Sequence, residues 1–147
     1  MSHHGLVFGG FLARLAFSAM LGLIIGYERQ WRGRPAGAHT TGLVAAGAAI
    51  FAAIGPVLEG ATAERIIANI VTGVGFLAGG VILRDGVNVT GLNTAATIWS
   101  TAAVGALTGV GLYREAFAGT IAILAVNLLA EPIAAMISAH IKRGQKQ

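Results

Sequence analysis

The chain has 147 residues, of which 55% are hydrophobic and 11% are charged, and its mean hydropathy is +0.74. Soluble domains carry about 25% charged residues, so this composition excludes an ordinary soluble protein and favours a membrane protein. The net charge is +4, but the basic residues are few and scattered, which favours membrane orientation over nucleic-acid binding. There is no cysteine, which excludes disulfides, thiolate metal sites and a cysteine nucleophile.

Five apolar segments are each long enough to cross a bilayer, which takes about 20 residues. They cover approximately residues 8–27, 39–58, 65–83, 92–112 and 116–137. Pro132 lies inside the last segment and should kink or shorten it. We therefore expect an all-α membrane protein. Its single domain, 1–141, would be a bundle of five transmembrane helices, and a short basic cytoplasmic tail, 142–147, would follow.

Lysine and arginine are divided unevenly between alternate ends of these segments. Seven fall on one side, and they are Arg29, Arg32, Arg34, Arg84, Lys142, Arg143 and Lys146. Three fall on the other, and they are Arg14, Arg65 and Arg114. The positive-inside rule then places the N-terminus outside and the C-terminus in the cytoplasm. The stretch YERQWRGRPAG, 27–37, becomes the first cytoplasmic loop.

Glycine pairs at i, i+4 spacing occur in three of the apolar segments. These pairs are Gly22/Gly26, Gly75/Gly79 and Gly105/Gly109. In lipid, such pairs let helix backbones approach closely. Chance is the alternative, because the chain contains 22 glycines, but three separate cases favour a tightly packed bundle.

Polar side chains also recur at membrane depth. In the fourth segment they form one helical stripe of Asn93, Thr97, Ser100, Thr101 and Thr108. Asn69 and Gly73 belong to a similar face of the third segment, and Asn127 and Glu131 share a face of the fifth. Two interpretations are open: hydrogen bonds between helices, or a polar path between the third and fourth segments.

No catalytic motif is present: there is no Gly-x-Ser-x-Gly elbow, no His-Glu-x-x-His pair and no P-loop. We therefore expect a protein that is not an enzyme and has no cofactor. Glu28 and Asp85 fall on the predicted cytoplasmic side and are candidate Mg²⁺ ligands, because Mg²⁺ prefers carboxylate oxygens. The alternative is that Glu28 pairs with Arg32 one turn later and that Asp85 stays solvated.

Three blocks of the sequence resemble the MgtC/SapB family of bacterial inner-membrane proteins: GLIIGYERQWRGRPAG (22–37), RIIANIVTGVGFLAGGVILRDG (65–86) and VTGLNTAATIW (89–99). The resemblance covers about residues 12–130 and implies a five-helix domain in the bacterial cytoplasmic membrane. It marks Glu28, Arg29, Arg65, Gly73, Gly75, Arg84, Asp85, Gly91, Asn93, Thr94, Thr97 and Trp99. One departure is His39, which stands where the family usually has arginine and replaces a fixed charge with a titratable group.

The resemblance implies a role in adaptation to low magnesium and in virulence-type stress. Members look like regulators that act on membrane partners, with the proton-conducting part of ATP synthase as one target. We thus expect a non-enzymatic regulator, homo-oligomeric with a dimer as the default. The alternative is a small transporter or channel for Mg²⁺ or another solute.

Each interpretation uses particular residues. The predicted intramembrane path consists of Asn69, Gly73, Thr97 and Thr101. The predicted polar cluster at the cytoplasmic side consists of Glu28, Arg29, Arg84, Asp85, Asn93 and Thr94. Within that cluster we expect Arg29 to form a forked bond with Glu28 or Asp85, which lysine could not reproduce.

Overall fold

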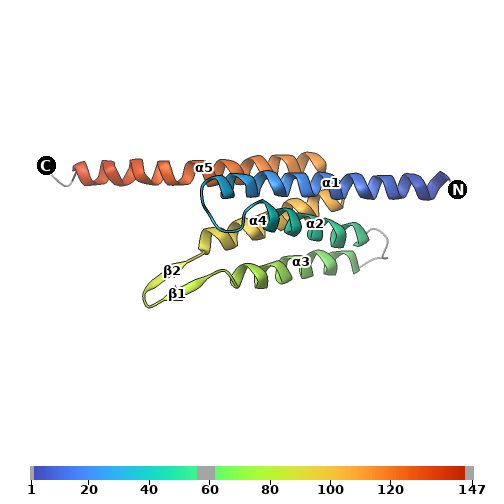
Figure 1. The fold of residues 1–147 in the computed structure, drawn as a ribbon, viewed down its shortest axis with the longest axis horizontal. Helices are drawn as coiled ribbons and strands as arrows, with labels where there is room; N and C mark the ends of the chain where they lie inside the picture. Colours follow the sequence, from blue (N-terminus) through green and yellow to red (C-terminus); the bar gives the residue numbers. More distant parts are fainter. Residues whose placement is uncertain (1, 56–61, 145–147) are drawn as a thin grey trace.

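The computed structural model describes residues 2–55 and 62–144, which form helices joined by short turns and one small hairpin (Figure 1). The helices are α1 (Ser2–Trp31), α2 (Ala38–Ile54), α3 (Thr62–Gly79), α4 (Leu92–Gly109) and α5 (Tyr113–Gly144). The strands β1 (Leu83–Asp85) and β2 (Asn88–Thr90) pair antiparallel between α3 and α4. The expected all-helical, five-helix architecture is confirmed.

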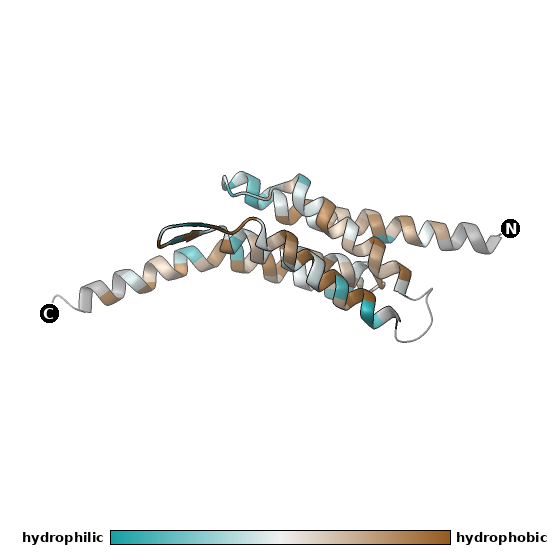
Figure 2. Ribbon diagram, turned by 90° about the horizontal axis from the view of Figure 1, so that it is seen from below, coloured by the Kyte–Doolittle hydropathy of each residue, from teal (hydrophilic) through white to brown (hydrophobic). Residues whose placement is uncertain are grey.

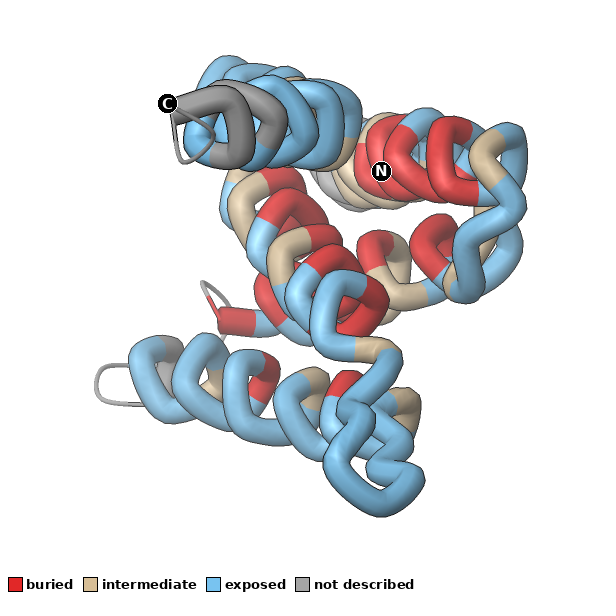
Figure 3. Tube along the Cα trace, turned by 90° about the vertical axis from the view of Figure 1, so that its left-hand side faces the viewer, coloured by how far each residue is buried: buried red, intermediate tan, exposed pale blue. Residues whose placement is uncertain are grey.

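The helices alternate in direction, and α2 and α4 lie at the centre of the bundle. The most extensive contacts are those of α1 with α2 and of α2 with α4, whereas α3 and α5 pack on the outside. The N-terminal part of α1 and the C-terminal part of α5 project beyond the bundle at opposite ends (Figure 1). In Figure 3 the buried turns gather where α1, α2 and α4 face one another. The fold therefore has a compact centre and two lightly covered outer helices.

Small residues allow the central helices to approach closely. A β-carbon at Gly26 would lie 2.0 Å from the Thr41 hydroxyl, and one at Gly105 would lie 2.2 Å from the Ala45 carbonyl oxygen. The buried Ser18 hydroxyl donates to that same Ala45 oxygen, at 2.8 Å. Buried alanines of α2 supply the facing surface. Because lipid is as apolar as the helices, close backbone packing of this kind is what holds such a bundle together.

The ends of the helices differ from the predicted spans. The stretch Tyr27–Trp31, expected to be loop, forms the last turns of α1, and only 32–37 leave the helix. Helix α3 ends at Gly79 instead of near residue 83. Pro56, expected near the end of the second span, lies outside the described residues. So do residues 145–147 of the predicted tail, whereas 142–144 continue α5.

Pro132 does not shorten α5, so that part of the expectation was wrong, and a kink at Pro132 stays a prediction. The helix continues to Gly144 with Pro132 inside it. Proline removes one backbone donor and leaves a carbonyl one turn earlier without its partner. Residues around this turn, including Leu128 and Ile133, are about half exposed, so the freed carbonyl is not sealed in the bundle core.

The break expected at 84–91 is instead a β-hairpin with the register Leu83↔Thr90 and Asp85↔Asn88. Its two-residue turn is Gly86-Val87, and glycine at the first position of such a turn, here with a positive φ of 59°, is a common hairpin signal. At Gly91, φ is 88°, and a β-carbon there would lie 2.0 Å from the Val81 carbonyl oxygen. This glycine therefore lets the chain turn from β2 into α4.

By length and apolar composition, two of the described helices qualify as membrane spans, Phe8–Trp31 and Tyr113–Ser138. Ala38–Ile54 is a shorter apolar helix, and α3 and α4 have 18 residues each. Figure 2 shows apolar residues along the helices and hydrophilic ones at the end of α1 and its loop and at the start of α3. This distribution suits a membrane protein whose polar groups lie towards the ends of the bundle.

Candidate functional site

Arg29 occupies the centre of the polar end of the bundle. It lies in the last turn of α1, where the helix dipole favours a cation, and it is only 4% exposed. Its guanidinium donates to the Pro35 carbonyl at 2.9 Å, to the Thr94 hydroxyl at 2.7 Å and to the Thr97 hydroxyl at 3.4 Å. Arg29 thereby ties the α1–α2 loop to the first turns of α4.

The forked bond expected between Arg29 and Glu28 or Asp85 is not what the structure contains. Adjacent residues of a helix point about 100° apart, so Glu28 and Arg29 face different neighbours. The Thr97 hydroxyl donates to the Asn93 carbonyl at 2.9 Å, which leaves its oxygen free to accept from Arg29. The charge of Arg29 is therefore met by hydroxyl and carbonyl dipoles of the loop and of α4.

Glu28 instead faces α5 and begins a cluster of charged and amide groups, which we call the ion-pair cluster. Its carboxylate accepts from the Asn127 amide at 3.3 Å and pairs with Arg32 at 3.4 Å. Arg32 also pairs with Glu131 at 2.7 Å, and Arg34 pairs with Glu131 as well. The cluster, Glu28, Arg32, Arg34, Asn127 and Glu131, fastens α5 to the end of α1. Glu131 is therefore an exposed partner of arginines and not an acid buried in the bundle.

A cleft with mixed polar and apolar walls lies between α4 and α5 next to this cluster. It has a volume of about 240 Å³, and its polar lining residues are Asn93, Thr97, Ser100 and Asn127. A smaller cavity of about 40 Å³ continues from Asn93 and Asn127 to the ion-pair cluster. Part of the polar stripe predicted for the fourth segment therefore faces α5. The polar path had been predicted between the third and fourth segments, which are α3 and α4.

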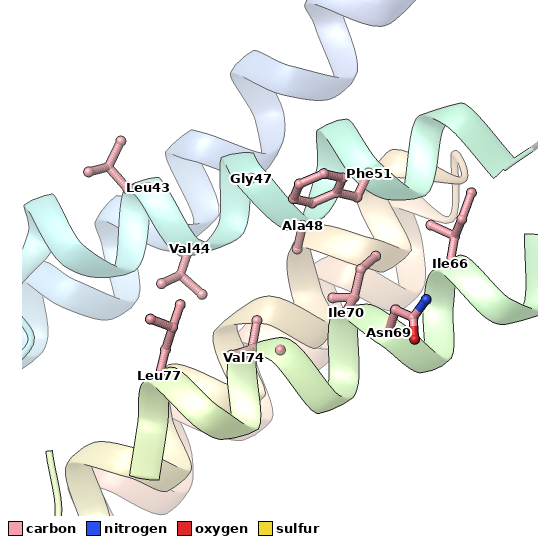
Figure 4. A pocket seen from close by; sticks show the side chains of 11 residues that line it. Leu43, Val44, Gly47, Ala48, Phe51, Ile66, Asn69, Ile70, Val74 and Leu77 are labelled. Atoms are coloured by element: carbon pink, nitrogen blue, oxygen red, sulfur yellow. The ribbon is translucent and has the colours of Figure 1, made fainter. Parts of the chain in front are cut away.

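The other residues of the predicted path lie elsewhere. Thr101 is buried, and its hydroxyl donates to the Thr97 carbonyl of its own helix; Thr108 of the same stripe is buried too and donates to the Val104 carbonyl. Asn69 and Gly73 line a separate groove of about 640 Å³ between α2 and α3, whose other walls are mostly apolar (Figure 4). The structure does not join Asn69, Gly73 and Thr101 with the α4–α5 cleft in one cavity.

Arg84 and Asp85 lie in the exposed β1–β2 hairpin, apart from the ion-pair cluster. The Arg84 side chain donates to the Gly86 carbonyl at 3.0 Å and so folds back over its own turn. The six residues predicted as one cytoplasmic cluster thus divide into Glu28, Arg29, Asn93 and Thr94 on the bundle and two residues on the hairpin. Among the described residues, no three His, Asp or Glu side chains lie close enough together to hold a metal ion.

Sequence reasoning missed three contributions. Arg14 donates to the Gly109 carbonyl at 2.8 Å, at the end of α4 where the helix dipole favours a cation. Arg32 and Arg34 reach across to α5, although the i, i+4 spacing of Glu28 and Arg32 and the shared face of Asn127 and Glu131 were visible. Nothing in the sequence indicated that the end of α1 and this face of α5 meet.

His39, which stands where the family usually has arginine, lies exposed at the start of α2.

A family model described as the MgtC family matches residues 15–136. The chain belongs to the MgtC family. It is 47% identical to Protein MgtC of Salmonella typhimurium over 128 residues, which cover 87% of this chain and 55% of that protein. It is 49% identical to Protein MgtC of Brucella abortus over 122 residues, 82% of this chain and 51% of that protein. It is also 48% identical to an uncharacterized protein of Synechocystis over 128 residues, which cover 86% of this chain and 55% of that protein.

The resemblance drawn from the three sequence blocks is thus confirmed, and the chain is an MgtC-type membrane protein. It spans about half the length of the curated relatives it matches. No solved structure matches it. The matched region includes Arg29, the ion-pair cluster and the hairpin, so all of these belong to the part of the chain that aligns with the family.

Proposed function

We propose that this MgtC-family chain is a non-enzymatic regulator in the bacterial cytoplasmic membrane. It crosses the bilayer five times, with its N-terminus outside and its C-terminus in the cytoplasm, and acts by contact with other membrane proteins when magnesium is scarce. The observation that carries this proposal is a pair of glycines, Gly75 and Gly79, that the fold itself does not use.

Gly75 and Gly79 lie one turn apart on the outward side of α3. Among the described residues, no atom lies within 4 Å of where a β-carbon of either glycine would be. Thr72 on the same helix donates to the Ala68 carbonyl at 3.0 Å, so its hydroxyl needs no further partner. This face of α3 carries two glycines at i, i+4 spacing beside the exposed ring of Phe76, and such a face is suited to close contact with another transmembrane helix.

The partner helix comes either from a second copy of the chain, as a dimer, or from another membrane protein. The family resemblance supports the proton-conducting part of ATP synthase as a candidate. In this proposal the chain uses no cofactor and binds no nucleic acid. Regulation then consists of one helix contact that changes the state of the partner.

The test is a double substitution, Gly75→Leu with Gly79→Leu, expressed in cells that lack the native protein. Leucine at both positions meets open space, so the protein should accumulate and insert normally, but the partner helix could no longer approach. We expect loss of growth at low magnesium. The matched control is Gly9→Leu with Gly10→Leu, because these glycines of α1 are also open. Normal growth of the α3 variant would contradict the proposal.

A second candidate function, a transporter or channel, is supported by the α4–α5 cleft, which has four polar residues among its mostly apolar walls. Mg²⁺ or another small solute would move past Asn93, Thr97 and Asn127 and leave beside the ion-pair cluster. The test is Mg²⁺ entry into liposomes that hold the purified protein and an internal Mg²⁺ dye, with Asn93→Leu measured beside it. Entry that the variant abolishes would establish transport. No entry, from protein shown to be folded, would favour the regulator.

A further inference from the structure

The last part of α5 lies beyond the membrane-spanning part of the bundle. Helix α5 starts at Tyr113, close to where Arg14 caps α4, and Glu131 pairs with Arg32 and Arg34 of the α1–α2 loop. From Tyr113 to Glu131 the helix rises by about 27 Å, close to the roughly 30 Å of a hydrocarbon core. The apolar stretch of α5 continues to Ser138, but the ion pairs of Glu131 mark the polar boundary within it, so residues 133–144 lie beyond that boundary. This segment also projects from the bundle in Figure 1.

This projecting segment has an apolar stripe. Ile133, Met136, Ile137 and Ile141 recur at i, i+3, i+4 and i+8, the spacing of one helix face, on which His140 occupies the i+7 position. Their exposed fractions lie between 47% and 69%. Four large apolar side chains in a row on a helix outside the hydrocarbon core would be unfavourable in water. Some apolar phase must therefore cover them.

The charge of the segment selects the kind of surface. After Glu131 the sequence has no acidic residue, whereas Lys142, Arg143 and Lys146 are basic. Ser138 lies on the side of the helix opposite the apolar stripe. A basic helix with one apolar face is suited to the interface of a membrane that contains anionic lipids.

Pro132 provides the bend that such placement needs. Proline cannot donate to the carbonyl one turn earlier, so the helix lacks one hydrogen bond just after Glu131. Sharp bends in helices usually occur at proline for this reason. The ion pairs of Glu131 hold the first part of α5 on the bundle, and the segment after Pro132 can tilt without breaking them.

We propose that residues 133–144 form an interfacial helix, hinged at Pro132, that lies on the anionic lipid surface of the same membrane with its apolar stripe in the headgroup–acyl boundary. This proposal rests on the membrane orientation given above. It adds a lipid contact to the regulator, so the lipid composition of the membrane would influence the position of α5.

The absence of cysteine makes a direct test available, because single cysteines can be introduced and labelled. Met136→Cys places a fluorophore on the apolar stripe, and Ser138→Cys is the matched control on the opposite side of the same segment. The full chain is reconstituted in vesicles of phosphatidylcholine, with and without phosphatidylglycerol. Quenching by brominated lipid reports contact with acyl chains, and quenching by iodide reports contact with water.

We expect lipid quenching at position 136 to be about twofold greater than at position 138, and iodide quenching to show the reverse order. The difference should grow with phosphatidylglycerol and shrink when Lys142 and Arg143 are both changed to Glu. Equal access of iodide to both positions would overturn the proposal, because the helix would then stand free in water. Protection of position 136 from both quenchers, with disulfide dimers of Met136→Cys, would also overturn it and indicate a second copy.

The orientation of the protein is tested separately with the same variants. In intact cells, a thiol reagent that does not cross the membrane should leave Ser138→Cys unlabelled. Labelling would contradict the cytoplasmic position of α5 and with it the topology proposed above. The quenching result would then still decide whether the segment lies on lipid, so failure of one proposal is distinguishable from failure of the other.

Discussion

Two glycine pairs with identical spacing, Gly105/Gly109 and Gly75/Gly79, have opposite surroundings. A β-carbon at Gly109 would lie 2.4 Å from the Ala49 carbonyl oxygen, just as one at Gly105 would collide with α2. At Gly75 and Gly79, no described atom lies within 4 Å of the corresponding position. The first pair therefore serves the fold, and the second is left for something outside it.

This difference extends to whole helices. Helices α1, α2 and α4 form a closed centre built on glycine, alanine and self-satisfied threonines. Helix α3 is mostly exposed, with Phe76 at 84%. Helix α5 packs on the centre only with its first part, through buried Ala116 and Thr120 and the ion-pair cluster, and its remainder is exposed. Stability should therefore depend on the centre, and partner contacts on the outer helices.

The largest effect should come from Gly105→Leu. The side chain would collide with the Ala45 backbone, so α2 and α4 would have to separate, with a loss of more than about 3 kcal/mol in the free energy of unfolding. Gly79→Leu should change the free energy of unfolding by less than about 0.5 kcal/mol, because its side chain would meet open space. Thermal unfolding in detergent, followed by circular dichroism, measures both. Equal losses would remove the distinction between the two pairs.

Arg29→Lys should have the next largest effect. Lysine cannot reproduce the simultaneous bonds to Pro35, Thr94 and Thr97, and buried bonds to a charged group contribute about 1.5–3 kcal/mol. Arg32→Lys is the matched control in the more exposed ion-pair cluster and should lower stability by less than about 1 kcal/mol. The same unfolding measurement ranks them. If Arg32→Lys lowered the free energy of unfolding more than Arg29→Lys, the ion pairs to α5 would matter more for stability than the bonds of Arg29 to the loop and α4.

Glu131→Gln removes two ion pairs from a side chain that is 45% exposed. Exposed pairs are screened by water and salt, so the expected loss is below about 1 kcal/mol. The loss should also shrink as salt is raised, because screening weakens the wild-type pairs. Unfolding at low and high salt tests this. A loss that salt does not change would mean that Glu131 acts through packing or through α5 geometry.

Thr101→Val should have the smallest effect although Thr101 is fully buried. Its hydroxyl bonds only to the Thr97 carbonyl of its own helix, at 2.7 Å, and valine has nearly the same shape. That carbonyl keeps its helical hydrogen bond, so we expect a loss of at most about 0.5 kcal/mol. A loss comparable to that of Arg29→Lys would indicate a bond from Thr101 to another helix, contrary to the structure.

The sequence predicted the helices well because hydrophobic length is a local property. It placed helix ends less well, since charged residues such as Arg29 continue α1 beyond its apolar part. The hairpin was visible only as Gly86-Val87, a signal that is weak without knowledge that α3 stops early. Pro132 does not shorten α5, because a proline ends a helix only where the freed carbonyl cannot be accommodated.

The site was harder to predict than the fold. The polar stripe of α4 was correctly identified as one helix face by its spacing, but spacing does not say which neighbour a face meets. Asn93 and Thr97 turn out to face α5, and Thr97 also accepts from Arg29, a residue 68 positions away. Such partners depend on how each helix is rotated in the bundle, which residue patterns leave undetermined.

The most direct test of the account is cross-linking from the unused glycine pair. Gly79→Cys, in a chain with no other cysteine, is labelled in native membranes with a membrane-permeable reagent that carries a maleimide and a benzophenone, and is then illuminated so that the benzophenone inserts into C–H bonds of any neighbour. Gly10→Cys is the matched control. We expect a specific adduct from position 79 and none from position 10. The adduct would be either a dimer of this chain or a complex with another membrane protein. Absence of an adduct at 79 in a correctly inserted protein, or the same adducts at both positions, would contradict the account.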